Sequence, residues 1–290
     1  MSILPINEEI FPLAEDYVFK AVLSHPDAKP ALIDLISAII GRTVEDVEIR
    51  NNELPSTDME EKNQRLDVNC VIDDGSQINV EMQGSKLSGV NSGQTVLVNK
   101  SIYYLTKLHS TQKLKGVKYE DFVRTYQITF CAHNIFEQDE YITFSTLRTE
   151  KGLQISDQVH LIFIELKKLD NILKKPVNEM TSVEDWSIFL GYSDDPDKRE
   201  LLNKILAKKG ALSMAGTLLA EISKDEHERA KRLSQQKYET DRDNEIIVAT
   251  EKGKHDANIK IAKKLKNAGI LTNIQIAEAT DLSIEEIEKL

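Results

Sequence analysis

The chain has 290 residues, of which 48 are acidic and 37 are basic, so its formal net charge at pH 7 is −11. Hydrophobic residues make up 40% and charged residues 29%, a composition that is typical of folded globular proteins and excludes a disordered chain. The length predicts about two domains. The negative charge excludes a protein that coats nucleic acid by bulk electrostatic attraction, but it allows an enzyme with one local acidic metal site.

Two cysteines, Cys70 and Cys131, are too few for a disulfide framework or a four-thiolate zinc site. The first residues lack the basic start and the apolar run of a signal peptide. The most apolar stretch, residues 31–40, is interrupted by Asp34 and is too short to cross a membrane. We therefore expect a cytoplasmic protein in a reducing compartment, with no membrane partner.

In chain order, the first predicted elements are two helices. One runs from about Glu15 to Leu23, and the second follows Asp27 with an apolar stripe that ends at Gly41. The pattern then changes to β-type runs at residues 47–50, 65–72, 77–83, 125–131, 141–147 and 159–165, interrupted by a helix over about 94–110. Residues 181–220 are helical again. This order predicts an α/β (α+β) fold with a mixed central sheet flanked by helices.

The C-terminal part divides by its charge pattern. From residue 221 to 254 charges of both signs are interleaved and apolar residues are sparse, which predicts a solvated helical connector. Residues 255–290 return to a helical pattern. They contain two capping boxes, Thr272 with Gln275 and Ser283 with Glu286. We therefore expect a main domain over 1–220, a connector over 221–254 and an all-helical tail over 255–290.

The tail has the look of a helix–turn–helix module. Its last predicted helix, residues 284–290, holds three glutamates, which would repel the phosphates of DNA. We therefore expect the tail to be an interaction module through which the chain forms a homo-oligomer.

The segment from residue 65 to 83 predicts a tight β-hairpin. Its three-residue loop, Asp73-Asp74-Gly75, fits a type I turn followed by a bulge, in which glycine supplies the left-handed position. Closing this loop pairs Ile72 with Ser76 and thereby fixes every other pair. One face is largely apolar and pairs Cys70 with Ile78, Val68 with Val80 and Leu66 with Met82. The other face pairs Asn69 with Asn79, Asp67 with Glu81 and Arg65 with Gln83.

Two carboxylates, those of Asp67 and Glu81, therefore face each other across the predicted hairpin. Directly opposite side chains have Cβ atoms about 4.5–5.5 Å apart, so this pair is repulsive unless something offsets the charge. Mg²⁺ and Mn²⁺ take oxygen ligands of this kind, and a bound ion of this class assists phosphodiester hydrolysis. The alternative is an exposed polar face on which the carboxylates turn to solvent and hold no ion.

Several short motifs occur in an order that resembles a known family. They are Asp16-Tyr17-Val18-Phe19-Lys20, Leu66-Asp67-Val68, Glu81-Met82-Gln83, Lys100-Ser101-Ile102-Tyr103-Tyr104 and the tail segment from Ile276 to Ile287. Their order and spacing resemble the Rpn family, the recombination-promoting nucleases of the PD-(D/E)XK superfamily, which are also described as transposases. The resemblance covers most of the chain.

The resemblance implies a restriction-endonuclease-like fold and a Mg²⁺-dependent DNA endonuclease, with Mn²⁺ as an alternative ion, linked to recombination or mobile elements. It makes Asp67 and Glu81 the metal ligands and places Gln83 at the lysine position of the superfamily. Gln83 has no charge to offer, so it would orient the attacking water or the phosphate by hydrogen bonding.

Two further residues have competing interpretations. Lys100 stands where the family tends to have arginine; it either steadies the phosphate or is a solvated helix residue. Asp16 either supports the site or complements the dipole of the first helix. At the level of the whole chain, the alternative to an endonuclease is a catalytically inactive relative that acts as a protein-interaction module through its tail, and cleavage of RNA is a further alternative.

Overall fold

The computed structural model describes residues 2–50, 66–84, 93–112 and 118–290. It contains a six-stranded sheet in the order β1-β2-β3-β4-β6-β5. The strands are β1 Val47–Ile49, β2 Val68–Ile72, β3 Gln77–Gln83, β4 Thr125–Cys131, β5 Ile142–Arg148 and β6 Gln154–Glu165. Parallel pairing joins β3 to β4 and β4 to β6, whereas the other neighbours are antiparallel. The predicted mixed sheet is confirmed.

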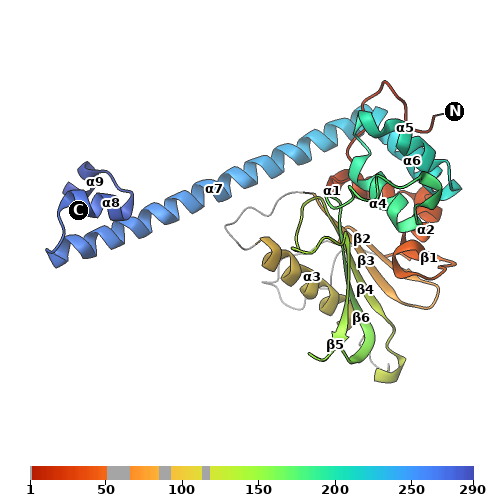
Figure 1. Ribbon diagram of the computed structural model, residues 1–290, viewed down its shortest axis with the longest axis horizontal. Helices are drawn as coiled ribbons and strands as arrows, with labels where there is room; N and C mark the ends of the chain where they lie inside the picture. Colours follow the sequence, from red (N-terminus) through yellow and green to blue (C-terminus); the bar gives the residue numbers. More distant parts are fainter. Residues whose placement is uncertain (1, 51–65, 85–92, 113–117) are drawn as a thin grey trace. The chain divides into compact units, whose positions relative to one another are not determined.

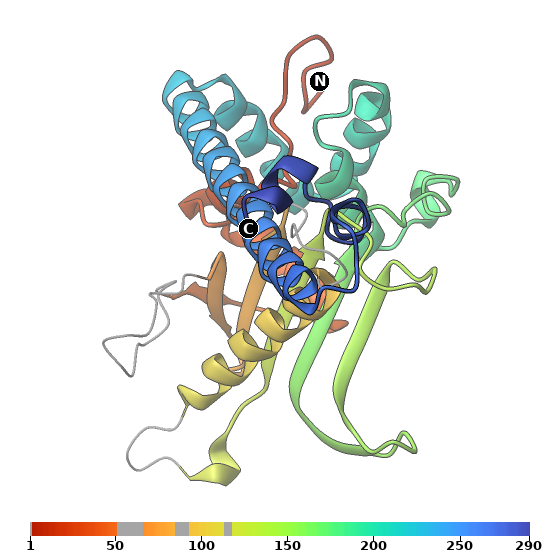
Figure 2. The ribbon, with the colours of Figure 1, turned by 90° about the vertical axis from the view of Figure 1, so that its left-hand side faces the viewer.

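Helices cover both faces of this sheet (Figures 1 and 2). On one face lie α1 Asp16–Leu23, α2 Lys29–Ile40, α4 Ser182–Tyr192, α5 Arg199–Leu206 and α6 Gly210–Lys224. These helices and the apolar side of the strands form the main core, in which Phe19, Phe130 and Trp186 are fully buried. The opposite face carries α3, Gly93–Ser110, which lies in front of the sheet in Figure 2 and packs Leu97 on Cys131 and Phe163.

The β2–β3 hairpin has the predicted register. Val68 pairs with Val80 and Cys70 with Ile78, and the backbone N–H of Ile72 donates to the carbonyl of Ser76 at 3.1 Å. Gly75 has a φ of 84°, the left-handed conformation that the three-residue loop requires. Arg65, which was expected to extend the polar face, lies outside the described residues. The turn chemistry was therefore sufficient to fix the pairing.

The strand β6 is longer than its sequence pattern indicates, since it begins at residue 154 and not at 159. The extra residues pair with the end of β5 through a register shift after Thr146. This extension holds one apolar residue, Ile155, which is exposed, so the apolar/polar alternation that marks a half-buried strand is missing there.

The chain divides into two compact units, Met1–Arg232 and Leu233–Leu290. The helix α7, Glu226–Ala268, begins in the first unit, and α8 Asn273–Thr280 and α9 Ile284–Glu288 belong to the second. Both predicted capping boxes are confirmed. A small core of Ala262, Ile276, Leu282 and Ile287 holds the second unit together. Within the described part of the chain, no helix is long and apolar enough to span a membrane.

The first turns of α7 are fixed to the N-terminal segment of the first unit. The guanidinium of Arg232 donates to both carboxylate oxygens of Glu15, at 2.7 and 2.8 Å, and lies over the ring of Phe11 with its Cζ 4.6 Å from the ring centroid. One turn earlier, Glu228 accepts a hydrogen bond from the hydroxyl of Tyr17. We call these contacts the α7 clamp. It joins α7 to the two residues that flank Asp16.

Candidate active site

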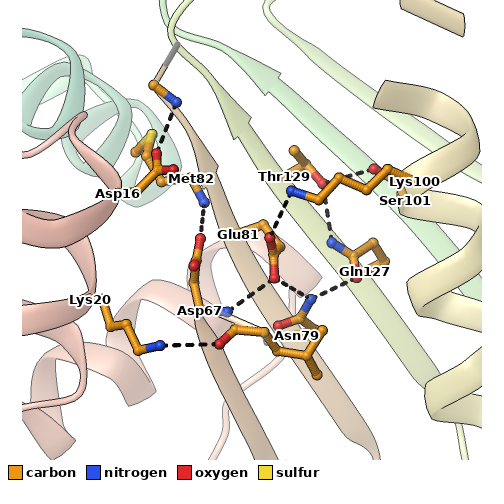
Figure 3. A network of polar contacts seen from close by, with 12 residues as sticks. Asp16, Lys20, Asp67, Asn79, Glu81, Met82, Lys100, Ser101, Gln127 and Thr129 are labelled. Atoms are coloured by element: carbon orange, nitrogen blue, oxygen red, sulfur yellow. Dashed lines mark hydrogen bonds and ion pairs between the residues drawn. The ribbon is translucent and has the colours of Figure 1, made fainter. Parts of the chain in front are cut away.

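The two predicted carboxylates meet at the end of the β2–β3 hairpin, between α1 and α3 (Figure 3). Asp67 directly precedes β2, and the regular ladder between the strands starts one residue later, at Val68. At Asp67 itself, side-chain bonds replace the ladder. The backbone N–H of Asp67 donates to Oε1 of Glu81 at 3.0 Å, and the backbone N–H of Met82 donates to Oδ2 of Asp67 at 2.9 Å. These two bonds hold both carboxylates at the hairpin end, where the sequence predicted a cross-strand pair.

Glu81 is the more deeply buried carboxylate, with 4% of its surface exposed. Its Oε1 atom accepts a second hydrogen bond, from the side-chain amide of Asn79 at 3.0 Å. Its Oε2 atom lies 3.5 Å from Nζ of Lys100 on α3. The Lys100 side chain is 38% exposed and its Nζ lies 5.3 Å from the centroid of the Tyr104 ring. The structure therefore places Lys100 at the carboxylates and not only on a solvated helix face.

Asp16, the first residue of α1, lies beside the end of β3. Its Oδ1 atom accepts a hydrogen bond from the backbone N–H of Gly84 at 3.1 Å. A Cβ atom on Gly84 would come within 2.6 Å of the carbonyl oxygen of Ala14, so this close approach of two backbones depends on glycine. The contact brings a third carboxylate toward the other two.

Negative charge accumulates at this point of the fold. Burial raises the pKa of Asp67 well above its usual range, and the neighbouring Glu81 and, more weakly, Asp16 raise it further. The Met82 N–H and Lys100 oppose this shift. Burial disfavours the charged form of Lys100, but the carboxylate of Glu81 and other neighbours outweigh that effect and raise its pKa. Lys100 therefore stays cationic next to carboxylates that repel each other.

Gln83 lies two residues after Glu81 on β3 and hence on the same face of the strand. It is buried, with 9% of its surface exposed, and its backbone carbonyl accepts from the N–H of Ala132 at 3.1 Å. A second cation, Lys20 of α1, donates to the carbonyl of Leu66 at 3.4 Å, one residue before Asp67. Lys20 belongs to one of the motifs that carry the resemblance, but no sequence pattern placed it beside Asp67.

The residues present fit a hard divalent cation. Among the described residues there is no group of three or more histidine, cysteine, aspartate or glutamate side chains arranged to hold a metal. Mg²⁺ does not need such a cage, because it commonly binds through one or two carboxylates and keeps several waters. Asp67 and Glu81 offer two carboxylates as oxygen ligands. Their mutual repulsion adds to burial in raising the pKa of Asp67, and a bound cation would relieve that repulsion.

Comparison with known protein families shows the family to which this chain belongs. The profile of the PD-(D/E)XK nuclease family transposases matches residues 13–249, which include all five predicted site residues. The chain belongs to this family. No curated protein and no solved structure is significantly similar to it. Membership in the PD-(D/E)XK transposase family confirms the resemblance drawn from the motifs between residues 16 and 104 and supports a nuclease or transposase-like role. The tail motif from Ile276 to Ile287 lies outside the matched residues.

The surroundings of the candidate site also include polar residues to which the sequence analysis gave no role at the carboxylates, although it placed one of them, Asn79, on the polar face of the hairpin. They lie on the α3 side of β3 and β4 and on α3 itself: Asn79, Gln127, Thr129 and Ser101. A signal for them was present, because residues 77–83 and 125–131 both alternate polar with apolar side chains. That alternation predicts a polar sheet face, but it does not predict that α3 buries it.

Proposed function

We propose that this chain is a metal-dependent endonuclease that hydrolyses phosphodiester bonds of DNA. The observation that supports the proposal most directly is the meeting of Asp67 and Glu81 beside the cation of Lys100, in a chain of the PD-(D/E)XK transposase family. Recombination or movement of mobile elements is the cellular process in which we place this activity.

In the proposed site Asp67 and Glu81 would hold Mg²⁺, with Mn²⁺ as an alternative. A bound ion of this kind supplies positive charge for the phosphoryl group and a more acidic water molecule. Lys100 would contact the phosphate as a point charge. Gln83 has an amide that both donates and accepts, so it would orient the attacking water by hydrogen bonding. Asp16 would support the site through its bond to Gly84.

Cleavage of supercoiled plasmid tests this proposal. We expect cutting with Mg²⁺ or Mn²⁺, none with a chelator, and loss of cutting in Asp67→Ala and in Glu81→Ala. The matched control is Asp157→Ala, which removes an exposed carboxylate of β6 that pairs with Arg124 far along the sheet, and it should cut like the wild type. An RNA substrate in parallel separates the two nucleic acids.

A folded wild-type protein that cuts neither substrate under any metal condition would contradict the proposal and favour the interaction module. Cutting that survives in both Asp67→Ala and Glu81→Ala would contradict the site but not the nuclease.

We further propose that the second unit mediates homo-oligomerisation. Its surface carries apolar side chains that the small core leaves exposed, among them Ile270 at 84% and Ile274 at 60%. A contiguous exposed apolar patch marks an interaction surface, and we propose that these side chains contribute to one. Light scattering on the full chain should show a smaller particle for the double variant Ile270→Ser/Ile274→Ser, and an unchanged mass would contradict this proposal.

A further inference from the structure

A layer of polar side chains is buried between the sheet and α3. On β3 it includes Asn79 and Glu81, and on β4 it includes Thr125, Gln127 and Thr129, each with less than 5% of its surface exposed. The parallel register places Asn79 beside Gln127 and Glu81 beside Thr129. Burying polar groups is costly unless they are hydrogen-bonded, so packing alone does not account for this layer.

Asn79 lies at the centre of the hydrogen bonds in this layer (Figure 3). Its side-chain nitrogen donates to Oε1 of Glu81 at 3.0 Å and to Oε1 of Gln127 at 2.9 Å, so both amide hydrogens are used. The orientation of the amide is fixed, because the reverse orientation would place its oxygen against the carboxylate. Gln127 in turn donates to the hydroxyl of Thr129 at 3.2 Å, which lies 3.4 Å from the hydroxyl of Ser101 on α3.

The two oxygens of Glu81 therefore have different surroundings. Oε1 is occupied by two donors, the Asn79 amide and the backbone N–H of Asp67. Oε2 faces Lys100 and has no other hydrogen bond among the described residues. An amide that occupies one oxygen in this way fixes the rotation of the carboxylate and leaves the other oxygen for a ligand.

The amide oxygen of Asn79 supports this interpretation. Asn79 is fully buried, and this oxygen has no hydrogen-bond partner in the described part of the chain. An unpaired buried acceptor costs about 1–3 kcal/mol, so a residue chosen only for stability would not be expected here. An asparagine at this position is explained if its side-chain nitrogen is needed to orient the Glu81 carboxylate.

We propose that Asn79 is a positioning residue, which orients Glu81 so that its Oε2 atom binds the divalent cation, and that Gln127 holds Asn79 in place. This inference rests on the proposed function, since it concerns the affinity of the site for the metal. Residues that orient metal ligands typically change metal affinity by 10–100-fold when they are removed.

The test is direct titration of the full-length protein with Mn²⁺. Binding is measured by calorimetry or from the electron paramagnetic resonance signal of free Mn²⁺. Asn79→Ala should weaken Mn²⁺ binding by at least about 10-fold. Gln127→Leu leaves Asn79 itself in place but removes the acceptor that holds it, together with the hydrogen bond to Thr129, and should weaken binding by a smaller factor. Gln127→Leu also keeps the test decisive if Asn79→Ala does not fold.

Thr125→Val is the matched control. Thr125 is a fully buried member of the same layer, but its hydroxyl bonds to His109 at 2.8 Å and Gln112 at 3.1 Å and not to Glu81. This variant should lose stability and keep the Mn²⁺ affinity of the wild type, because a purely structural change in the layer does not reach the carboxylate.

Three results are distinguishable. Weaker binding in Asn79→Ala and Gln127→Leu but not in Thr125→Val supports the inference. Wild-type affinity in a folded Asn79→Ala or Gln127→Leu protein overturns it and leaves the proposed function standing. A wild-type protein that binds no Mn²⁺ overturns both.

Discussion

Replacing Asp67 by asparagine should make the metal-free protein more stable. In the absence of a cation, burial and the Glu81 carboxylate both penalise the ionised form of Asp67 and raise its pKa. Asparagine has nearly the same shape, and its amide oxygen can still accept the hydrogen bond that the Met82 N–H gives to Oδ2. The change therefore removes charge while it keeps most of the packing.

The size and the pH dependence of this gain follow from the pKa shift. Each unit by which folding raises the pKa costs the ionised form about 1.4 kcal/mol. Asp67 is half-buried and partly screened by solvent, so we expect a gain of about 2 kcal/mol at pH 8. Because the folded pKa is raised, the unfolded chain releases this proton first, above about pH 4, and wild-type stability falls as the pH rises from there. At pH 4 and below, the gain should vanish.

Urea unfolding in the presence of a chelator, at pH 4, 6 and 8, measures this effect. Asp157→Asn is the control, because the guanidinium of Arg124 lowers the pKa of that exposed carboxylate and its removal should bring no gain. A gain for Asp67→Asn that is equal at pH 4 and pH 8, or a loss at pH 8, would refute the electrostatic reasoning. Added Mg²⁺ should stabilise the wild type and leave Asp67→Asn unchanged.

Two further substitutions address the surroundings of the carboxylates. Gly84→Ala should lower the free energy of unfolding by about 1–3 kcal/mol, because its Cβ would meet the carbonyl of Ala14 at 2.6 Å, and urea unfolding would show no change if α1 can move away. Lys100→Met should reduce plasmid cleavage by about 100-fold, because it removes the positive charge that we propose contacts the phosphate. It should not weaken Mn²⁺ binding, because it also removes the cation that lies 3.5 Å from Oε2 of Glu81. Unchanged cleavage by a folded Lys100→Met protein would contradict a role of Lys100 in binding the phosphate.

The parts of the site that could be predicted are those fixed by local rules. A three-residue loop with glycine at its third position allows one register, and that register brings Asp67 to Glu81 before any tertiary contact is known. The helix caps at Thr272 and Ser283 are local in the same sense, because each involves residues three positions apart.

The contacts of Glu81 with its partners join different segments, and residue patterns alone did not predict those contacts. Lys100 was a site candidate only through the family resemblance, and Asn79 was placed only on the polar face of the hairpin. Asn79 reaches Gln127 only because β4 returns parallel to β3, and the two residues are 48 positions apart. Lys100 reaches Glu81 only because α3 packs on the polar face of the sheet. Periodicity shows which residues share a face, but it does not show which element covers that face.

The α7 clamp determines where the C-terminal tail could be replaced by that of a related protein. The charge pattern of the sequence shifts at residue 221, which invites a junction there for a chimera. In the clamp, however, Glu228 and Arg232 bind to Tyr17 and Glu15 at the start of α1 and therefore belong structurally to the first unit. A chimera joined after Arg232 would keep the contacts of Arg232 with Glu15 and of Glu228 with Tyr17. A chimera joined at residue 221 would lose both contacts unless the new sequence supplied equivalent residues.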